Sequence, residues 1–279
     1  MAEETQTSLM DYDLLIINGS INSKVIDEVL EIDETKVNQR LIVVINTYGG
    51  SPYVAYRAMT HLQYLYPSPG KIEFVVPDLA MSAGTLMCLG GDNIYMHEGS
   101  CLGPLDLQVE HPSDGEMISS LDIRQAAYRI LSLTQLTAGE IFETAKDEFK
   151  LSKTEAAKLA YSSAVELFVP LVKKIDPYHL QEGYRAAPIS SHYAKLLMVR
   201  SIPNAATRNK IAKDLTEEYQ THSYAITKDE VKFLGLNVGK LTELDIYNDV
   251  ISKYDKTKVG VSYQQVTFPT KAKKEKNAA

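Results

Sequence analysis

A short apolar run that leads into a small-residue turn and then into a helical pattern recurs along the first ninety residues. The apolar runs cover residues 13–19, 41–46 and 72–76. Continuous apolar runs of this length are typical of strands buried on both faces, as in parallel sheets. The alternation of such strands with helical patterns predicts an α/β protein with a largely parallel sheet.

The remainder of the chain is dominated by helical periodicity. Shorter strands are expected at residues 92–96 and 100–105, and helices at 21–32, 52–66, 81–90, 118–136, 137–149, 152–174, 190–200, 227–235 and 242–254. Ser152 and Glu155 have the spacing of a capping box. The expected organisation is a disordered lead (1–10), a single domain (11–260) whose residues 112–220 form a mostly helical elaboration, and a tail (261–279).

Composition excludes several classes of protein. The net charge is −7 over 279 residues, so general affinity for nucleic acid is not expected. The acidic N-terminus lacks the apolar segment of a signal peptide, and no apolar run is long enough to span a membrane. Cys88 and Cys101 lack metal-ligand spacing and are expected to be reduced thiols. A soluble, cytoplasmic protein is therefore expected.

Two of the small-residue turns carry groups that an acyl-transfer site needs. Ser82 follows the run at 72–76, and Gly49 and Gly50 follow the run at 41–46. In parallel sheets, sites form beyond the carboxyl ends of the strands, so the two turns are expected to face the same crevice. Ser82 would be the nucleophile, and the N–H groups of Ala83 and of Gly49 or Gly50 would hold the oxyanion.

The same residues resemble a known group of proteases. The turn from Asn46 to Ser51 is similar to the Asn-Ser-Pro-Gly-Gly turn of the Clp protease proteolytic subunit, and its pairing with Met81 to Gly84 is shared with the signal peptide peptidase A group. The most extensive resemblance is to the Clp-like serine dehydrogenase proteinases, and it spans about residues 12 to 245. It covers Val76–Pro77 through Leu86, Leu102 to Gln108 and His192 to Ala194, and also Tyr184-Arg185-Ala186, Thr221 to Thr227 and Leu234 to Val238.

This resemblance implies a Clp/crotonase-like core of repeated ββα units with a helical elaboration, and hydrolysis of peptide bonds by serine. It implies a peptide or protein substrate, a homo-oligomer, and no metal or organic cofactor. The Gly-x-Gly-x-x-Gly fingerprint of dinucleotide binding does not occur in the sequence.

The general base has several candidates. Asp106 aligns with the position of the histidine in Clp subunits, and His222 lies near the position of the Clp aspartate. We therefore expect His222 as the base and Asp106 as the carboxylate that orients it, since triads are defined by geometry and not by chain order. The alternatives are His111, or a lysine as in the signal peptide peptidase A group: Lys146, Lys153 or Lys158.

Departures from the family pattern leave other functions open. Tyr48 replaces a proline before the glycine pair, Leu107 replaces a proline after Asp106, and the loop at 109–116 differs. The favoured hypothesis is a serine peptidase. A binding or scaffold protein with a weakened or dormant site, and an enzyme acting on acyl thioesters, are the alternatives.

Overall fold

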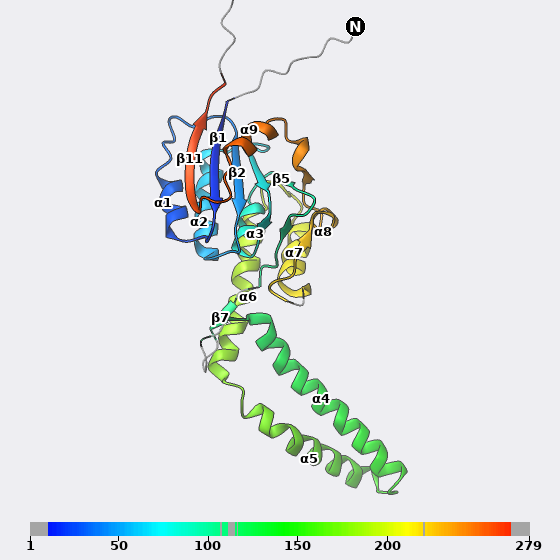
Figure 1. Ribbon diagram of the computed structural model, residues 1–279. Helices are drawn as coiled ribbons and strands as arrows, with labels where there is room; N and C mark the ends of the chain where they lie inside the picture. The colour runs from blue at the N-terminus through cyan, green and yellow to red at the C-terminus, as the bar shows by residue number, and fades with distance from the viewer. Residues whose placement is uncertain (1–10, 107, 111–114, 116, 220, 269–279) are drawn as a thin grey trace, which may run out of the picture. The chain divides into compact units, whose positions relative to one another are not determined.

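The computed structural model describes residues 11–106, 108–110, 115, 117–219 and 221–268. The chain forms two units (Figure 1). The first comprises Met1–Leu105 together with Ser191–Ala279, and the second comprises Asp106–Ser190. The first unit contains the main sheet, and the second contains two long helices.

A six-stranded sheet forms the centre of the first unit, in the order β10-β5-β3-β2-β1-β11. Neighbouring strands are parallel except β11, which is antiparallel to β1. The strands are β1 (Tyr12–Asn18), β2 (Leu41–Asn46), β3 (Ile72–Val76), β5 (Asn93–Met96), β10 (Val238–Lys240) and β11 (Gly260–Val266). The predicted α/β class with a mostly parallel sheet is confirmed.

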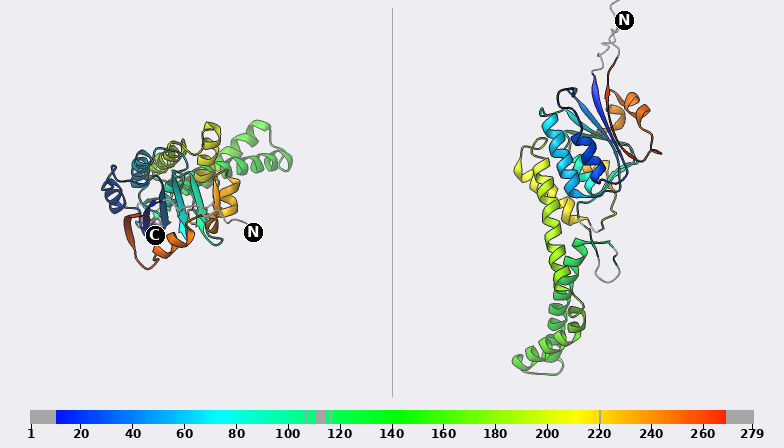
Figure 2. Two further views of the ribbon diagram at one scale, coloured as in Figure 1. Left: turned by 90° about the horizontal axis from the view of Figure 1, so that it is seen from above. Right: turned by 90° about the vertical axis from the view of Figure 1, so that its left-hand side faces the viewer.

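Both faces of the sheet are covered, which explains the unbroken apolar runs in the sequence. Val43 and Ile45 of β2 pack on the face that carries α1, α2 and α3, whereas Ile42 and Val44 pack on the opposite face with η2 and α9. Figure 2 shows these helices on the two sides of the sheet. Their bounds are α1 (Ser23–Leu30), α2 (Pro52–Leu65), α3 (Ala83–Cys88), the 3₁₀ turn η2 (Leu241–Glu243) and α9 (Tyr247–Lys253).

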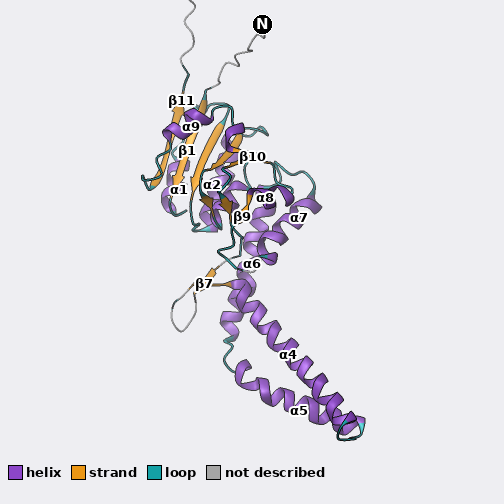
Figure 3. Cartoon of the chain, turned by 45° about the vertical axis from the view of Figure 1, so that its right-hand side comes forward, coloured by secondary structure: helices purple, strands orange, loops and turns teal. Residues whose placement is uncertain are grey.

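A second, three-stranded sheet in the same unit has the order β4-β6-β9. It consists of β4 (Leu79–Ala80), β6 (Cys101–Leu102) and β9 (Ile226–Thr227), and Figure 3 labels β9. The segment before β9 contains α7 (Ala205–Lys213) and the π-helical turn η1 (Asp214–Glu218), and α8 (Lys228–Phe233) follows it. This sheet matters for function because β4 leads directly to Ser82.

The second unit is largely helical. A hairpin of β7 (Gln108–Glu110) and β8 (Met117–Ser119) precedes α4 (Ser120–Asp147), which packs against α5 (Lys153–Val172). The expected capping box of Ser152 and Glu155 begins α5. α6 (Pro177–Leu197) ends the unit, and its residues after Ser190 belong to the first unit.

Three expectations about these elements differ from the structure. α4 is one helix and not two, because Gly139 within it lies in open space and does not break it. α6 begins at Pro177, where Asp176 caps it by accepting the N–H of Tyr178 at 2.7 Å, and it continues through Pro188. Residues 260–266, placed mostly in the tail by the sequence, form β11.

None of the helices in the described part of the chain combines the length and the apolar character needed to cross a bilayer. Cys88 and Cys101 are free thiols, and burial raises the pKa of both.

Candidate functional site

The backbone at Ser82 is strained. Its φ of 50° and ψ of −113° lie in a region that residues with a Cβ seldom adopt, and such a conformation costs on the order of 1–3 kcal/mol. Ser82 stands at the N-cap position of α3, yet its hydroxyl does not cap the helix. No hydrogen bond to the hydroxyl is found among the described residues. The side chain is half-buried and is therefore within reach of solvent.

The turn after β2 lies directly against Ser82. The N–H of Thr47 donates to the carbonyl of Leu79, and the N–H of Met81 donates to the carbonyl of Thr47, both at 2.9 Å. A Cβ on Gly49 would stand 3.0 Å from the Cβ of Ser82 and 3.2 Å from the carbonyl oxygen of Met81. Only glycine fits at this position, where φ is also +116°. The two small-residue turns are therefore neighbours, at the carboxyl ends of their strands.

Two backbone amides beside Ser82 are available to a ligand. The N–H of Gly49 donates to Thr47 Oγ1 at 2.9 Å, so this amide is occupied. The N–H groups of Gly50 and Ala83, in contrast, have no acceptor among the described residues. For Ala83 the reason is its position in the first turn of α3, where N–H groups lack intrahelical partners. Gly50 and Ala83 thus remain the candidate oxyanion donors.

Two buried threonines, whose roles the sequence analysis missed, fix this arrangement. Thr85 Oγ1 lies 2.7 Å from the carbonyl oxygen of Ala80 and 2.8 Å from that of Gly103, and it accepts the N–H of Gly103 at 2.9 Å. The Cγ2 methyl of Thr47 occupies the space where a Cβ on Gly84 would stand, at 2.4 Å. The sequence did contain one signal for the role of Thr85, because this residue places a polar hydroxyl within the otherwise apolar pattern of α3.

Replacing Thr85 by valine is expected to destabilise the fold by about 2–4 kcal/mol. Valine keeps the shape but leaves the N–H of Gly103 and a buried carbonyl without a partner, and each such group costs about 1–3 kcal/mol. The free energy of unfolding in urea measures the effect. Thr60→Val is the matched control, because the Thr60 hydroxyl bonds to Tyr56 on an exposed face of α2. Equal effects of the two substitutions would contradict this role of Thr85.

The segment that carries His222 enters the three-stranded sheet at the end from which the chain leaves toward Ser82. Ala80, Leu102 and Ile226 lie side by side across β4, β6 and β9. Because β9 is antiparallel, the chain enters it at the end where β4 leaves toward Ser82. Strand spacings of about 4.8 Å put Ala80 and Ile226 about 10 Å apart. His222 itself is half-buried.

The loop that carries His222 is held by aromatic side chains. The rings of Tyr219 and Tyr224 are 4.8 Å apart, and the Tyr224 hydroxyl donates to Glu230 at 2.9 Å. Burial raises the pKa of Tyr219 to about 12, so its phenol stays neutral. No hydrogen bond joins the Ser82 hydroxyl to His222 or to any other described residue. Catalytic hydrogen bonds are often long in free enzymes.

The other candidate residues belong to the second unit. Asp106 is buried, and its carboxylate accepts a hydrogen bond from the Ser119 hydroxyl at 2.6 Å. His111 lies outside the described residues. Lys146 forms an ion pair with Glu143 that raises the pKa of its ammonium, the opposite of what a lysine base needs. Lys153 and Lys158 are exposed, as is normal for solvated lysines.

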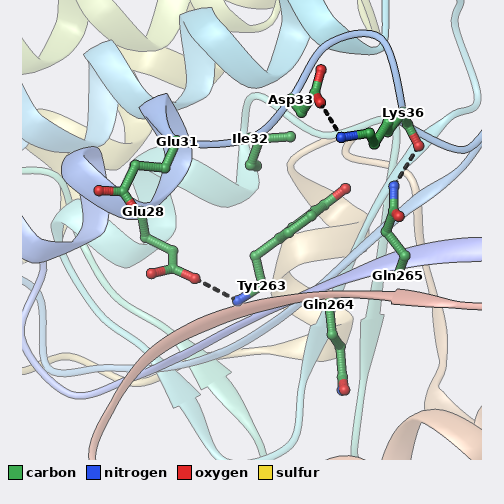
Figure 4. A pocket seen from close by; sticks show the side chains of 8 residues that line it. All are labelled: Glu28, Glu31, Ile32, Asp33, Lys36, Tyr263, Gln264 and Gln265. Carbon is green, nitrogen blue, oxygen red and sulfur yellow. Dashed lines mark hydrogen bonds and ion pairs between the residues drawn. The ribbon is translucent and has the colours of Figure 1, made fainter.

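One pocket of the first unit does not involve these turns. It lies between α1 and β11, and none of the candidate residues is among those that line it, which are Glu28, Glu31, Ile32, Asp33, Lys36, Tyr263, Gln264 and Gln265 (Figure 4). In it the N–H of Tyr263 donates to Glu28, and Lys36 pairs with Asp33. The described residues contain no cluster of three or more His, Cys, Asp or Glu side chains that could hold a metal ion.

Comparison with known sequences gives distant relatives. No protein-family model matches the chain. Two uncharacterized proteins of Methanocaldococcus jannaschii, MJ0137 and MJ1495, are each 25% identical to it, over 205 and 240 residues. The matches cover 74% and 85% of this chain, and 55% and 65% of the relatives. The chain thus spans less than two-thirds of the length of these relatives.

Two similar solved structures are mutants of the 1510-N membrane-bound stomatin-specific protease. The first, a serine-to-alanine mutant, has 19% identity and a TM-score of 0.31, and the match covers 51% of this chain and 66% of that one. The second, a lysine-to-alanine mutant in complex with a substrate peptide, has 23% identity and a TM-score of 0.31, covering 52% and 70%. The structural similarity therefore extends over about half of the chain.

Proposed function

We propose that the chain is a serine peptidase in which Ser82 is the nucleophile. The observation that carries this proposal is the local geometry of Ser82. A strained backbone presents a hydroxyl that neither caps its helix nor bonds to a described residue. Next to it are two backbone amides for which the described part of the chain offers no acceptor. A serine that served only as a turn residue would have no need of this conformation, since glycine would adopt it without strain.

The proposed reaction proceeds in two steps. Ser82 Oγ attacks the carbonyl carbon of the peptide, and its proton passes to the imidazole of His222. The N–H groups of Ala83 and Gly50 donate to the oxygen that becomes negatively charged, and each such donor is worth about 10²–10³ in rate. The C–N bond then breaks, and the amine leaves with the proton from His222. Water hydrolyses the acyl-enzyme, with His222 again accepting and returning a proton.

His222 is preferred over the lysines because the three-stranded sheet brings its segment to the edge where Ser82 lies. The role of Asp106 in orienting His222 stays a prediction. The scaffold and thioester alternatives are outcomes of the following test.

Labelling with a fluorophosphonate probe tests the proposal directly. The wild-type chain is expected to form a stable adduct on Ser82, found by mass spectrometry of the digested protein, and Ser82→Ala is expected to remain unlabelled. Ser51→Ala serves as a matched control, because the Ser51 hydroxyl caps α2 by accepting the N–H of Val54 at 3.3 Å. This variant should still label. A wild type that stays unlabelled at every pH from about 7.5 to 9, above the ordinary pKa of histidine, would favour the scaffold alternative. A wild type that is labelled, and that turns over thioesters but not peptides, would favour the alternative of an enzyme acting on acyl thioesters.

A further inference from the structure

The first half of α4 carries an exposed acid and an exposed base on the same side of the helix. A shallow hollow on this helix is lined by Asp122, Gln125, Ala126, Tyr128, Arg129 and Ser132, hereafter the α4 face. Asp122 and Arg129 are exposed, and neither forms an ion pair within the described part of the chain. They are seven residues apart, which is two helical turns, so both point to the same side of α4.

The α4 face also includes an exposed aromatic side chain. Tyr128 is 61% exposed, although large apolar residues on a helix normally pack against something. The buried hydrophobic residues described in α4 and α5 are alanines instead: Ala138, Ala145, Ala156, Ala160 and Ala164. The helical pair therefore leaves apolar area that a partner could cover.

The α4 face is complementary to itself. If two α4 helices lie antiparallel about a two-fold axis between Gln125 and Ala126, residue 122 of each helix faces residue 129 of the other. Each Asp122 then meets an Arg129, and the contact forms twice because a two-fold interface is isologous. At the axis, the small Ala126 leaves room for Gln125 of the other helix. This register makes both ion pairs with no change in the helices.

We propose that the α4 face is a contact between two copies of this chain, paired antiparallel through Asp122 and Arg129. The α4 face carries one acid and one base, so its net charge is zero. Nucleic acid or an anionic lipid surface would instead select a cluster of positive charge. Two helical pairs joined in this way form a four-helix assembly, a common way to cover apolar helix faces. The proposal is independent of the chemistry at Ser82.

Charge-swap variants of the full-length chain test the register. Asp122→Arg places Arg against Arg129, and Arg129→Asp places Asp against Asp122, so each single variant is expected to weaken self-association at least about tenfold by like-charge repulsion. The double variant Asp122→Arg/Arg129→Asp restores both pairs with the signs reversed and should associate like the wild type. An equimolar mixture of the two single variants should form mixed dimers, because each then supplies the charge that the other needs.

Sedimentation velocity over a range of concentrations measures these dissociation constants, and circular dichroism confirms that each variant keeps its helices. Glu140→Arg is the matched control, since Glu140 is an exposed acid on the same helix outside the α4 face. It should leave association unchanged. A wild-type chain that stays monomeric, single variants that associate normally, or a double variant as weak as the singles would each overturn the proposal.

Discussion

Replacing Ser82 by glycine is expected to abolish peptidase activity and, at the same time, to stabilise the fold. Loss of the nucleophile should lower kcat by at least about 10³-fold, because the chemistry has no substitute for the hydroxyl. Stability should rise because glycine adopts the φ of 50° at this position without a Cβ penalty. Relief of about 1–3 kcal/mol of strain exceeds the ~0.5–1 kcal/mol by which glycine favours the unfolded chain. The net gain is about 1 kcal/mol.

Ser82→Ala separates the two effects. Alanine also lacks the hydroxyl but keeps the Cβ, so it should be as inactive as glycine and no more stable than the wild type. Peptide turnover and the midpoint of thermal unfolding are the two measurements, and 1 kcal/mol corresponds to a shift of about 2–4 °C for a chain of this size. A glycine variant that melts below the alanine variant would show that Ser82 carries no strain. Residual turnover in both variants would show that another group attacks the substrate.

Gly50→Ala is expected to cause the largest loss of stability of any single methyl addition at the two turns, above about 3 kcal/mol. A Cβ there would stand 2.3 Å from the carbonyl oxygen and 2.8 Å from the amide nitrogen of Ile21. Both are backbone atoms, and they are held in place by the hydrogen bonds from Ile21 to Gly49 and from Ser51 to Ile21, each 2.9 Å. The substitution must therefore separate the β2 turn from the segment that begins α1.

Gly70→Ala is the matched control. Gly70 also has a positive φ, +80°, but nothing lies within 4 Å of its Cβ position. It should therefore show only the backbone penalty, about 1–2 kcal/mol. Urea unfolding of the two variants compares the values, and the difference between them reports the contact with Ile21. If both variants lost the same amount, the close approach of Gly50 to Ile21 would have no energetic consequence.

The strands of the main sheet could be predicted from the sequence because burial on both faces leaves a local signature. The runs at 41–46 and 72–76 match β2 and β3 in their bounds. β10 and β11 were missed for the same physical reason. They lie at the two edges of the sheet, where Gly239 is half-buried and Gln264 and Gln265 are exposed. No apolar run therefore marks these strands in the sequence.

The candidate site was predictable in part. The small residues around Ser82, and the glycines of the other turn, stand out in the sequence because few residues fit where two turns meet. The hydrogen bonds of Thr47 and Thr85 could not be inferred, since they depend on contacts with Gly49, Ala80 and Gly103 that no local pattern encodes. Likewise, the position of His222 depends on the pairing of β9 with β6, across more than a hundred residues.

The antiparallel pairing of β11 with β1 determines where extensions of the chain can be attached. Tyr12 pairs with Val266, and the N–H of Phe268 donates to Asp11 at 2.8 Å, so the two described ends are neighbours. They leave the sheet at the edge where the parallel strands begin, whereas Ser82 lies beyond the edge where those strands end. A tag or a fused domain at either end should therefore leave the approach to Ser82 open. A short linker between the two ends would also allow the chain to be circularly permuted.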